Sequence, residues 1–231
     1  LVNLFFLTLL FESCSGTRFF KSSEYIIDRN EIYEDGIILK NNPINFVIKT
    51  KSNKKILGIP LKKILYETSH PDPEGQFNKW LNKKEKRRKR LENWITDKQI
   101  NALNNYAVKF NDWLKKTGEA PAIYDSLDVK ISKDNIIQYY KNLGYFNVQV
   151  ESETEKLNKK NLVVKYIIKP KERYLIDSIN ASIESPELYI LYKENLKDQI
   201  IKQGEPFEIN KFEDERERLF TIFRNNGVYN F

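Results

Sequence analysis

The chain offers few side chains of the kinds that carry out catalysis or bind metals. His70 is the only histidine, and it lies in Ser69-His70-Pro71-Asp72-Pro73, a loop sequence because of its prolines. We therefore predict neither a histidine-based triad nor a multi-histidine metal site. The 8 glycines show no phosphate-binding spacing. These observations predict no catalytic residue, no metal and no cofactor, and so a protein that is not an enzyme.

An acidic cluster near the C-terminal end is the other candidate for acid-base or metal chemistry. It consists of Glu213, Asp214, Glu215 and Glu217, interleaved with Arg216 and Arg218. The cluster lies where a helix is expected to begin, and acidic side chains there complement the helix dipole. We interpret the cluster as structural.

A basic run is the strongest local charge feature in a chain of 231 residues and net charge +7. Its cationic members are Lys83, Lys84, Lys86, Arg87, Arg88, Lys89 and Arg90. The run predicts the solvated face of an amphipathic helix. A second interpretation places it against anionic membrane headgroups, where all three tryptophans of this region, Trp80, Trp94 and Trp113, would suit the interface.

The N-terminal segment resembles an export signal. Leu1 to Phe11 is apolar except for Asn3 and Thr8, and it is too short to span a bilayer, which takes about 20 residues. The only cysteine, Cys14, follows in a sequence similar to a lipobox, so we expect it to carry a lipid. The alternative is a free cysteine behind an uncleaved apolar segment. A single cysteine provides no internal disulfide.

One sequence motif occurs twice in the chain. Residues 135–148 and 218–231 place large apolar residues at the same distances before Gly144 and Gly227. This spacing predicts a helix that ends on a glycine in the left-handed conformation. Repeats of this kind are typical of arrays of binding modules.

A second repeated phrase marks where each copy begins. Tyr25-Ile26-Ile27-Asp28 resembles Tyr174-Leu175-Ile176-Asp177. The distance to the glycine is 119 positions in the first copy and 53 in the second, which predicts an insertion of 66 residues. We place this insertion, with its own helices, at about residues 61–117.

The order of elements follows from the residue patterns in the two copies. In the second copy we expect a strand from Tyr174 to Ile183, a helix over residues 186–203, a turn at 204–207 and the repeated helix. Asn210 is the expected N-cap of that helix, and Ser132 the expected cap in the first copy. Residues 118–121 are expected to form the turn that matches 204–207.

After the first repeated helix, alternating apolar residues predict a β-hairpin at 148–168. The fold class is therefore α+β, with tandem β-α-α-β-β units. We assign residues 1–23 to the signal and tether, 24–170 to the first unit and 171–231 to the second, which is truncated.

A sheet of this kind has an edge strand whose backbone groups are unpaired. Such an edge binds an extended segment of another protein by β-augmentation. We predict that Val148, Gln149, Val150 and Glu151 form this binding edge. The segment 169–173 is expected to act as a hinge between the two units.

Several motifs resemble the N-terminal region of TamL-type lipoproteins in the BamA/TamA superfamily of outer-membrane barrel assembly proteins. They include the start at Cys14, the Lys54-Lys55-Ile56-Leu57-Gly58 sequence, residues 113–121, 144–147 and 213–229. The resemblance implies POTRA domains, whose β-α-α-β-β order is the order derived above. It also implies a periplasmic role at the outer membrane and anchoring to the membrane by lipid.

The implied partners are the C-terminal β-barrel of the full-length protein, a TamB-like protein that spans the periplasm, and unfolded outer-membrane proteins as clients. We expect no nucleic acid as a partner under this interpretation. One alternative is a nucleic-acid-binding protein that uses the basic run, and another is a structural envelope lipoprotein.

Overall fold

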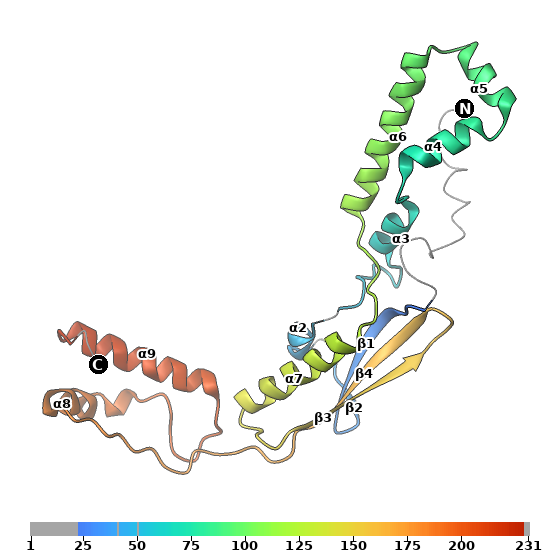
Figure 1. The fold of residues 1–231 in the computed structure, drawn as a ribbon. Helices are drawn as coiled ribbons and strands as arrows, with labels where there is room; N and C mark the ends of the chain where they lie inside the picture. Colours follow the sequence, from blue (N-terminus) through green and yellow to red (C-terminus); the bar gives the residue numbers. More distant parts are fainter. Residues whose placement is uncertain (1–22, 41, 50, 229–231) are drawn as a thin grey trace. The chain divides into compact units, whose positions relative to one another are not determined.

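The computed structural model describes residues 23–40, 42–49 and 51–228 (Figure 1). Their secondary structure follows the order β1(Ile26–Glu34), β2(Ile37–Ile38), α2(Ile44–Val47), α3(Leu61–Thr68), α4(Pro73–Asn82), α5(Glu85–Glu92), α6(Asp97–Thr117), α7(Ser126–Asn142), β3(Gln149–Lys156), β4(Asn161–Lys169), α8(Pro186–Glu194), η1(Leu196–Asp198) and α9(Ile209–Asn225). Two compact units divide the described residues. The first holds 23–30, 51–125 and 154–164, and the second holds the rest. None of the described helices is both long and apolar enough to cross a membrane.

The sheet has the strand order β2-β1-β4-β3. The bonds from Ile26 N to Lys160 O and from Asp35 N to Ile168 O advance in the same direction along β1 and β4, so these strands are parallel. Parallel neighbours need a long crossover, which here contains all helices from α2 to α7. The α+β class and the β-α-α-β-β order are confirmed, while the two-residue strand β2 makes the sheet four-stranded rather than three-stranded.

The buried side chains explain why this region folds around the hairpin of β3 and β4. Five residues of β4, Leu162, Val163, Val164, Tyr166 and Ile168, are buried. Helix α7 contributes the buried residues Val129, Ser132, Ile136 and Tyr140. The Tyr140 hydroxyl donates a hydrogen bond to Glu34 at the end of β1. Burial, followed by this bond, raises the pKa of Tyr140 above its ordinary value of 10.0, so the phenol stays protonated.

The inserted helices α3 to α6 occupy residues 61–117, which are the limits expected from the sequence. The chain passes along α4, turns through α5 and returns along α6, which contacts both α3 and α4 (Figure 1). Ile100 and Leu114 are buried on one side of α6. The insertion is thus a small helical assembly with its own contacts.

The repeated phrase forms the same structure in both copies. Shifting α7, residues 126–142, by 83 positions gives 209–225, the limits of α9. Gly144 and Gly227 both have positive φ, 90° and 83°. Tyr145 N bonds to Tyr140 O, and Val228 N bonds to Phe223 O at the equivalent position. Both helices therefore end in the glycine-terminated motif that the sequence predicted.

The start of each copy is also reproduced. In the first copy, Ile26 forms an isolated antiparallel bridge with Ile123, just before α7. In the second, Leu175 forms the same bridge with Pro206, just before α9. The matching register pairs Ile123 with Pro206, so residues 118–121 are not the counterpart of 204–207. Residues 119–122 run without turn structure, and the expected turn there is wrong.

The second copy departs from the expected elements in three places. Residues 176–183 are not a strand, because among the described residues their backbone pairs only with the loop at 204–206. The expected helix over 186–203 is interrupted after Glu194 and continues as the 3-10 turn η1. Helix α9 begins at Ile209 after Glu208, so Asn210 is inside the helix rather than its cap.

The expected cap of the first repeated helix is also wrong. Ser132 lies inside α7, and its hydroxyl donates to Asp128 O, one turn earlier, at 2.7 Å. The same oxygen accepts a hydrogen bond from Lys49 N at 3.1 Å. Ser132 therefore links the segment that follows α2 to helix α7 by hydrogen bonds.

Gly144 and Gly227 share a positive φ but differ in how closely other atoms approach them, so substituting each one separates the effect of backbone conformation from that of packing. A Cβ on Gly144 would lie 2.7 Å from Phe207 O, whereas a Cβ on Gly227 meets no described atom within 4 Å. We expect Gly227→Ala to cost about 1 to 2 kcal/mol, because alanine resists positive φ. Gly144→Ala should cost about 1 to 3 kcal/mol more, because a backbone oxygen must move.

Urea unfolding of both variants, followed by circular dichroism, measures this difference. Equal losses for the two variants would show that the approach of Phe207 to Gly144 does not constrain the fold.

Candidate functional site

Strand β3 is the open edge of the sheet. In the order β2-β1-β4-β3 its only strand neighbour is β4. The opposite edge is largely covered, because β2 pairs with Tyr33 and Glu34, and the segment before α7 bridges to Ile26. Among the described strands, β3 therefore presents the longest row of unpaired backbone donors and acceptors.

The side chains of β3 give this edge an acidic character. Val150 is buried, while Gln149 and Glu151 on either side of it are exposed. Because side chains alternate along a strand, Glu151, Glu153 and Glu155 share the face opposite to Val150. All three glutamates are exposed. The sequence-predicted residues Gln149, Val150 and Glu151 thus lie at the start of the edge, and Val148 immediately precedes it.

An open depression of about 690 Å³ lies where β3 begins. Its lining residues are Asn147, Val148, Gln149, Lys171 and Glu172. Lys171 adopts a positive φ of 67°, which is unusual for a residue with a side chain. The structure therefore brings the predicted edge residues next to the predicted hinge segment.

The predicted hinge is attached to the end of α7. Tyr174 N bonds to Gly144 O at 2.9 Å. Arg173 donates from Nε to Leu143 O and from a terminal nitrogen to Glu208 Oε1, at 2.8 and 2.7 Å. These bonds hold Glu208, the residue that precedes α9, to the segment at the end of α7.

Two arginines of the basic run contact named neighbours, and the other described side chains of the run are exposed. Arg87 donates to Trp80 O, and its guanidinium lies 4.8 Å from the Trp80 ring centroid. Arg88 pairs with Glu92 at 2.7 Å. Lys83, Lys84, Lys89 and Arg90 are exposed. The side chain of Lys86 and the whole of Cys14 lie outside the description.

His70 has a structural role in this fold. Asn111, buried in α6, accepts a hydrogen bond from His70 N and donates one to His70 O, at 2.6 and 3.0 Å. The ring nitrogen Nδ1 lies 2.7 Å from Asp72 O. Asp72 in turn caps α4 by accepting from Gly75 N at 2.8 Å. No group of three or more His, Cys, Asp and Glu side chains in the described ranges is placed to hold a metal.

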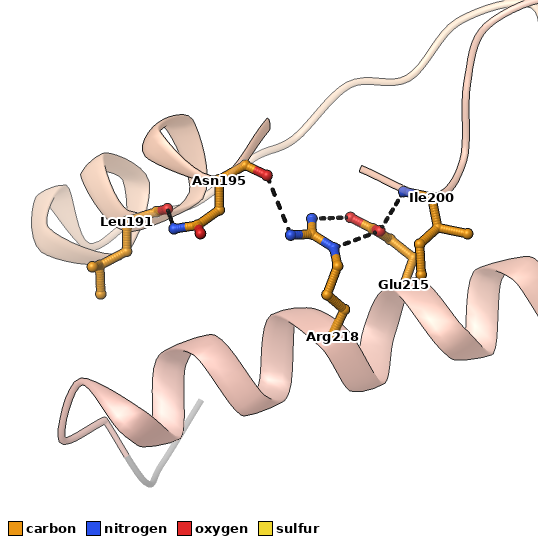
Figure 2. A network of polar contacts seen from close by, with 5 residues as sticks. All are labelled: Leu191, Asn195, Ile200, Glu215 and Arg218. Carbon is orange, nitrogen blue, oxygen red and sulfur yellow. Dashed lines mark hydrogen bonds and ion pairs between the residues drawn. The ribbon is translucent and has the colours of Figure 1, made fainter. Parts of the chain in front are cut away.

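The sequence analysis did not predict a polar contact between the two helices of the second copy (Figure 2). Glu215 and Arg218 form it, and we call this pair the latch. Glu215 is 5% exposed and accepts from Ile200 N at 2.9 Å. Arg218 binds both carboxylate oxygens of Glu215, at 2.9 and 2.6 Å, and also donates to Asn195 O at 3.2 Å. The pair connects α9 to the backbone that follows α8.

The first copy has the same latch in neutral form. Ser132 and Asn135 occupy the positions of Glu215 and Arg218 when the chain is shifted by 83 residues. Ser132 accepts from Lys49 N, and Asn135 donates to Val47 O at 2.9 Å. Polar residues 12 and 9 positions before each repeated glycine were the sequence signal that could have revealed the latch.

The environment of Glu215 keeps it charged. Burial by itself raises the pKa of a carboxyl group, but the hydrogen bonds from Arg218 and Ile200 N outweigh it. The net effect lowers the pKa of Glu215 below its ordinary value of 4.5. Its neighbours Glu213, Asp214 and Glu217 are part of the same helix, so the acidic cluster contains one buried structural carboxylate.

Comparison with known protein families identifies a POTRA domain, described as a surface antigen variable number repeat, at residues 89–171. The matched range covers α6, α7, β3 and β4, whereas β1 of the same sheet comes from residues before the insertion. Searches of curated proteins and of solved structures find no significant match. POTRA domains bind protein partners, so this match indicates a protein-interaction role.

The latch predicts a specific pattern of mutational effects. Arg218→Asn leaves the buried Glu215 carboxylate without its counter-charge, and we expect a loss of about 3 to 5 kcal/mol in unfolding free energy. The double variant E215S/R218N copies the neutral latch of the first copy and removes the buried charge. We expect it to be at least about 1 kcal/mol more stable than R218N alone, as measured by urea unfolding. A double variant less stable than R218N would contradict the equivalence of the two latches.

Glu215 also predicts a pH dependence. A carboxyl group whose folded pKa is depressed contributes stability above its ordinary pKa and loses it as the pH falls through the folded value. The difference in unfolding free energy between the native chain and Glu215→Gln should be constant near neutral pH and should shrink below about pH 4.5. Urea midpoints of both proteins between pH 7 and 3 test this. A difference that grows on acidification would show that Glu215 is not held as an anion.

Proposed function

We propose that this chain is the periplasmic POTRA arm of an outer-membrane protein assembly or translocation factor, and that it binds client or partner proteins by β-augmentation along β3. The observation that carries the proposal is the open edge of β3 in a sheet that lies partly within the POTRA match. Backbone hydrogen bonds along such an edge do not depend on the sequence of the guest. This property suits a protein that handles many clients.

The guest is an extended segment, and the acidic row sets its preferred chemistry. Glu151 and Glu153 would lie beside alternate side chains of an added strand, where opposite charges are favourable by about 0.2 to 1 kcal/mol per pair. A guest with Lys or Arg at alternate positions therefore binds best. Acidic side chains on an edge also oppose pairing with an identical edge, so the row disfavours self-association through β3.

The depression beside Val148 and Lys171 gives the guest a defined place to begin. Its lining residues come from the start of β3 and from the segment that follows β4. A side chain of the guest that enters this depression fixes the register of the added strand, which backbone bonds alone leave open.

The proposed setting follows the family resemblance. A lipid on Cys14 anchors the arm to the periplasmic side of the outer membrane. The β-barrel of the full-length protein, a TamB-like protein and unfolded outer-membrane proteins are the proposed partners. Palmitate labelling of the native chain and of Cys14→Ala tests the anchor separately from the binding edge.

The β-augmentation test uses an extended peptide with lysines at alternate positions. N-methylation on alternate residues that face β3 removes the donors needed for the ladder while keeping every side chain. We expect this modification to abolish binding in a titration, whereas N-methylation on the other alternate residues leaves most of it. Equal effects of the two modifications would exclude β-augmentation.

Charge-reversal variants provide the matched control on the protein. Glu151→Lys with Glu153→Lys should weaken binding of the lysine peptide several-fold, while Glu184→Lys with Glu194→Lys, at exposed sites that are not part of the sheet, should not. A photo-crosslinker placed at Glu153 should trap the peptide. Trapping only at α8 would place the binding site elsewhere.

A further inference from the structure

The turn between α4 and α6 combines cations with an exposed tryptophan. From Lys83 to Lys98 the chain has eight cations against three acids. Trp94 lies in this turn and is 88% exposed. Tryptophan buries a large apolar area in folded proteins, so its exposure beside a cationic helix requires an explanation.

The turn holds Trp94 in place by backbone hydrogen bonds. Trp94 N and Ile95 N both donate to Leu91 O, at 2.9 and 2.8 Å, and Asn93 N donates to Lys89 O at 3.2 Å. The indole therefore projects from an ordered turn at the end of α5. Its exposure is a property of the fold.

Two arginines of the run stabilise the turn itself. Arg87 contacts Trp80 of α4, and Arg88 pairs with Glu92 within α5. The structure gives Lys83, Lys84 and Arg90 no ion pair with any residue it describes, and all three are exposed. These three cations are available to a negatively charged partner.

Helix α6 continues the apolar character of this region. Leu103, Tyr106, Phe110 and Trp113 follow a spacing of three, four and three residues, so they share one face of the helix. Their exposed fractions are 47%, 70%, 44% and 51%. An apolar helical face next to Lys and Arg side chains is typical of helices that lie in the interface of a membrane.

We propose that the helical hairpin formed by α4 and α6, with α5 at its turn, binds the surface of a bilayer that contains anionic lipids. Lys83, Lys84 and Arg90 contact the negatively charged headgroups, and Trp94 enters the interfacial region, where tryptophan is enriched in membrane proteins. Leu103 adds an exposed aliphatic side chain to the row on α6, and aliphatic contact suits a lipid rather than a nucleic-acid base, whereas the aromatic members of the row would suit either partner. This site is distinct from β3 and does not depend on it.

The test measures binding of the full chain to vesicles of neutral phosphatidylcholine with and without phosphatidylglycerol. Because Leu1 to Phe11 is itself apolar, the readout is the gain in affinity on adding the anionic lipid. Each cation near an anionic surface contributes roughly a fivefold factor, so K83Q/K84Q/R90Q should bind anionic vesicles about 100-fold more weakly. No gain with anionic lipid for the native chain would overturn the proposal.

A matched variant removes the same charge elsewhere. Lys130, Lys197 and Lys202 are exposed and lie outside the hairpin. K130Q/K197Q/K202Q should lose only a few-fold in affinity. An equal loss in both triple variants would show a response to net charge and would overturn the site.

The fluorescence of Trp94 can report whether this residue enters the bilayer. In W80F/W113F it is the only tryptophan, because the chain has 3. Brominated anionic lipids should quench its fluorescence, and the emission should shift to shorter wavelength. Unchanged emission in bound protein would overturn the placement of Trp94. Displacement of the protein from vesicles by a single-stranded oligonucleotide at lower concentration than by soluble polyanions would assign the cations to nucleic acid instead.

Discussion

The helix pair of each copy depends on one backbone donor that lies in a part-buried contact and must be paired there. The chain that leaves the first helix of a pair brings an N–H group, of Lys49 or of Ile200, against the second helix. An unpaired donor at such a place is costly, so the second helix must supply an acceptor. Ser132 and Glu215 supply it from the same position, and the two helices of each copy are thereby held together.

Ser132 and Glu215 accept equivalent backbone hydrogen bonds, but they differ in charge and therefore in what each needs from its surroundings. A serine is neutral, and its own proton goes to Asp128 O in the preceding turn. A buried glutamate is charged and needs the guanidinium of Arg218, which then also satisfies Asn195 O. A buried ion pair adds little net stability over neutral groups, but each partner depends strongly on the other. The second copy is therefore the one whose helix pair is sensitive to single changes and to acid.

Local signals in the sequence predicted local structure well. The apolar spacing before Gly144 and Gly227 predicted both helices and their left-handed ends. These features depend on residues within a few turns of one another. Three of the four residues of the predicted edge, Gln149, Val150 and Glu151, also lie at the start of β3, because alternation marks a strand.

Predictions that depended on distant partners failed. A strand was predicted from Tyr174 to Ile183, yet a strand needs a neighbour, and the described residues provide none for residues 177–183. The Asn210 signature was wrong, because α9 begins at Ile209, and Arg173 binds the Glu208 side chain just before it. The depression beside β3 was missed for the same reason, since it requires Lys171 and Glu172 to return to the start of the strand.

The repeat also explains why β3 is the edge left open. In both copies the residues that begin the copy bridge to the residues just before the second helix, Ile26 to Ile123 and Leu175 to Pro206. The hydrogen bonds from Ile27 N to Ala122 O and from Ile176 N to Glu205 O repeat in the same register. The segment before the second helix thus pairs with the start of each copy, and in the first copy β2 pairs with the end of β1. Any copy of the unit that keeps this bridge has one protected edge, and a guest strand can add only on the far side, next to the acidic row in the first copy.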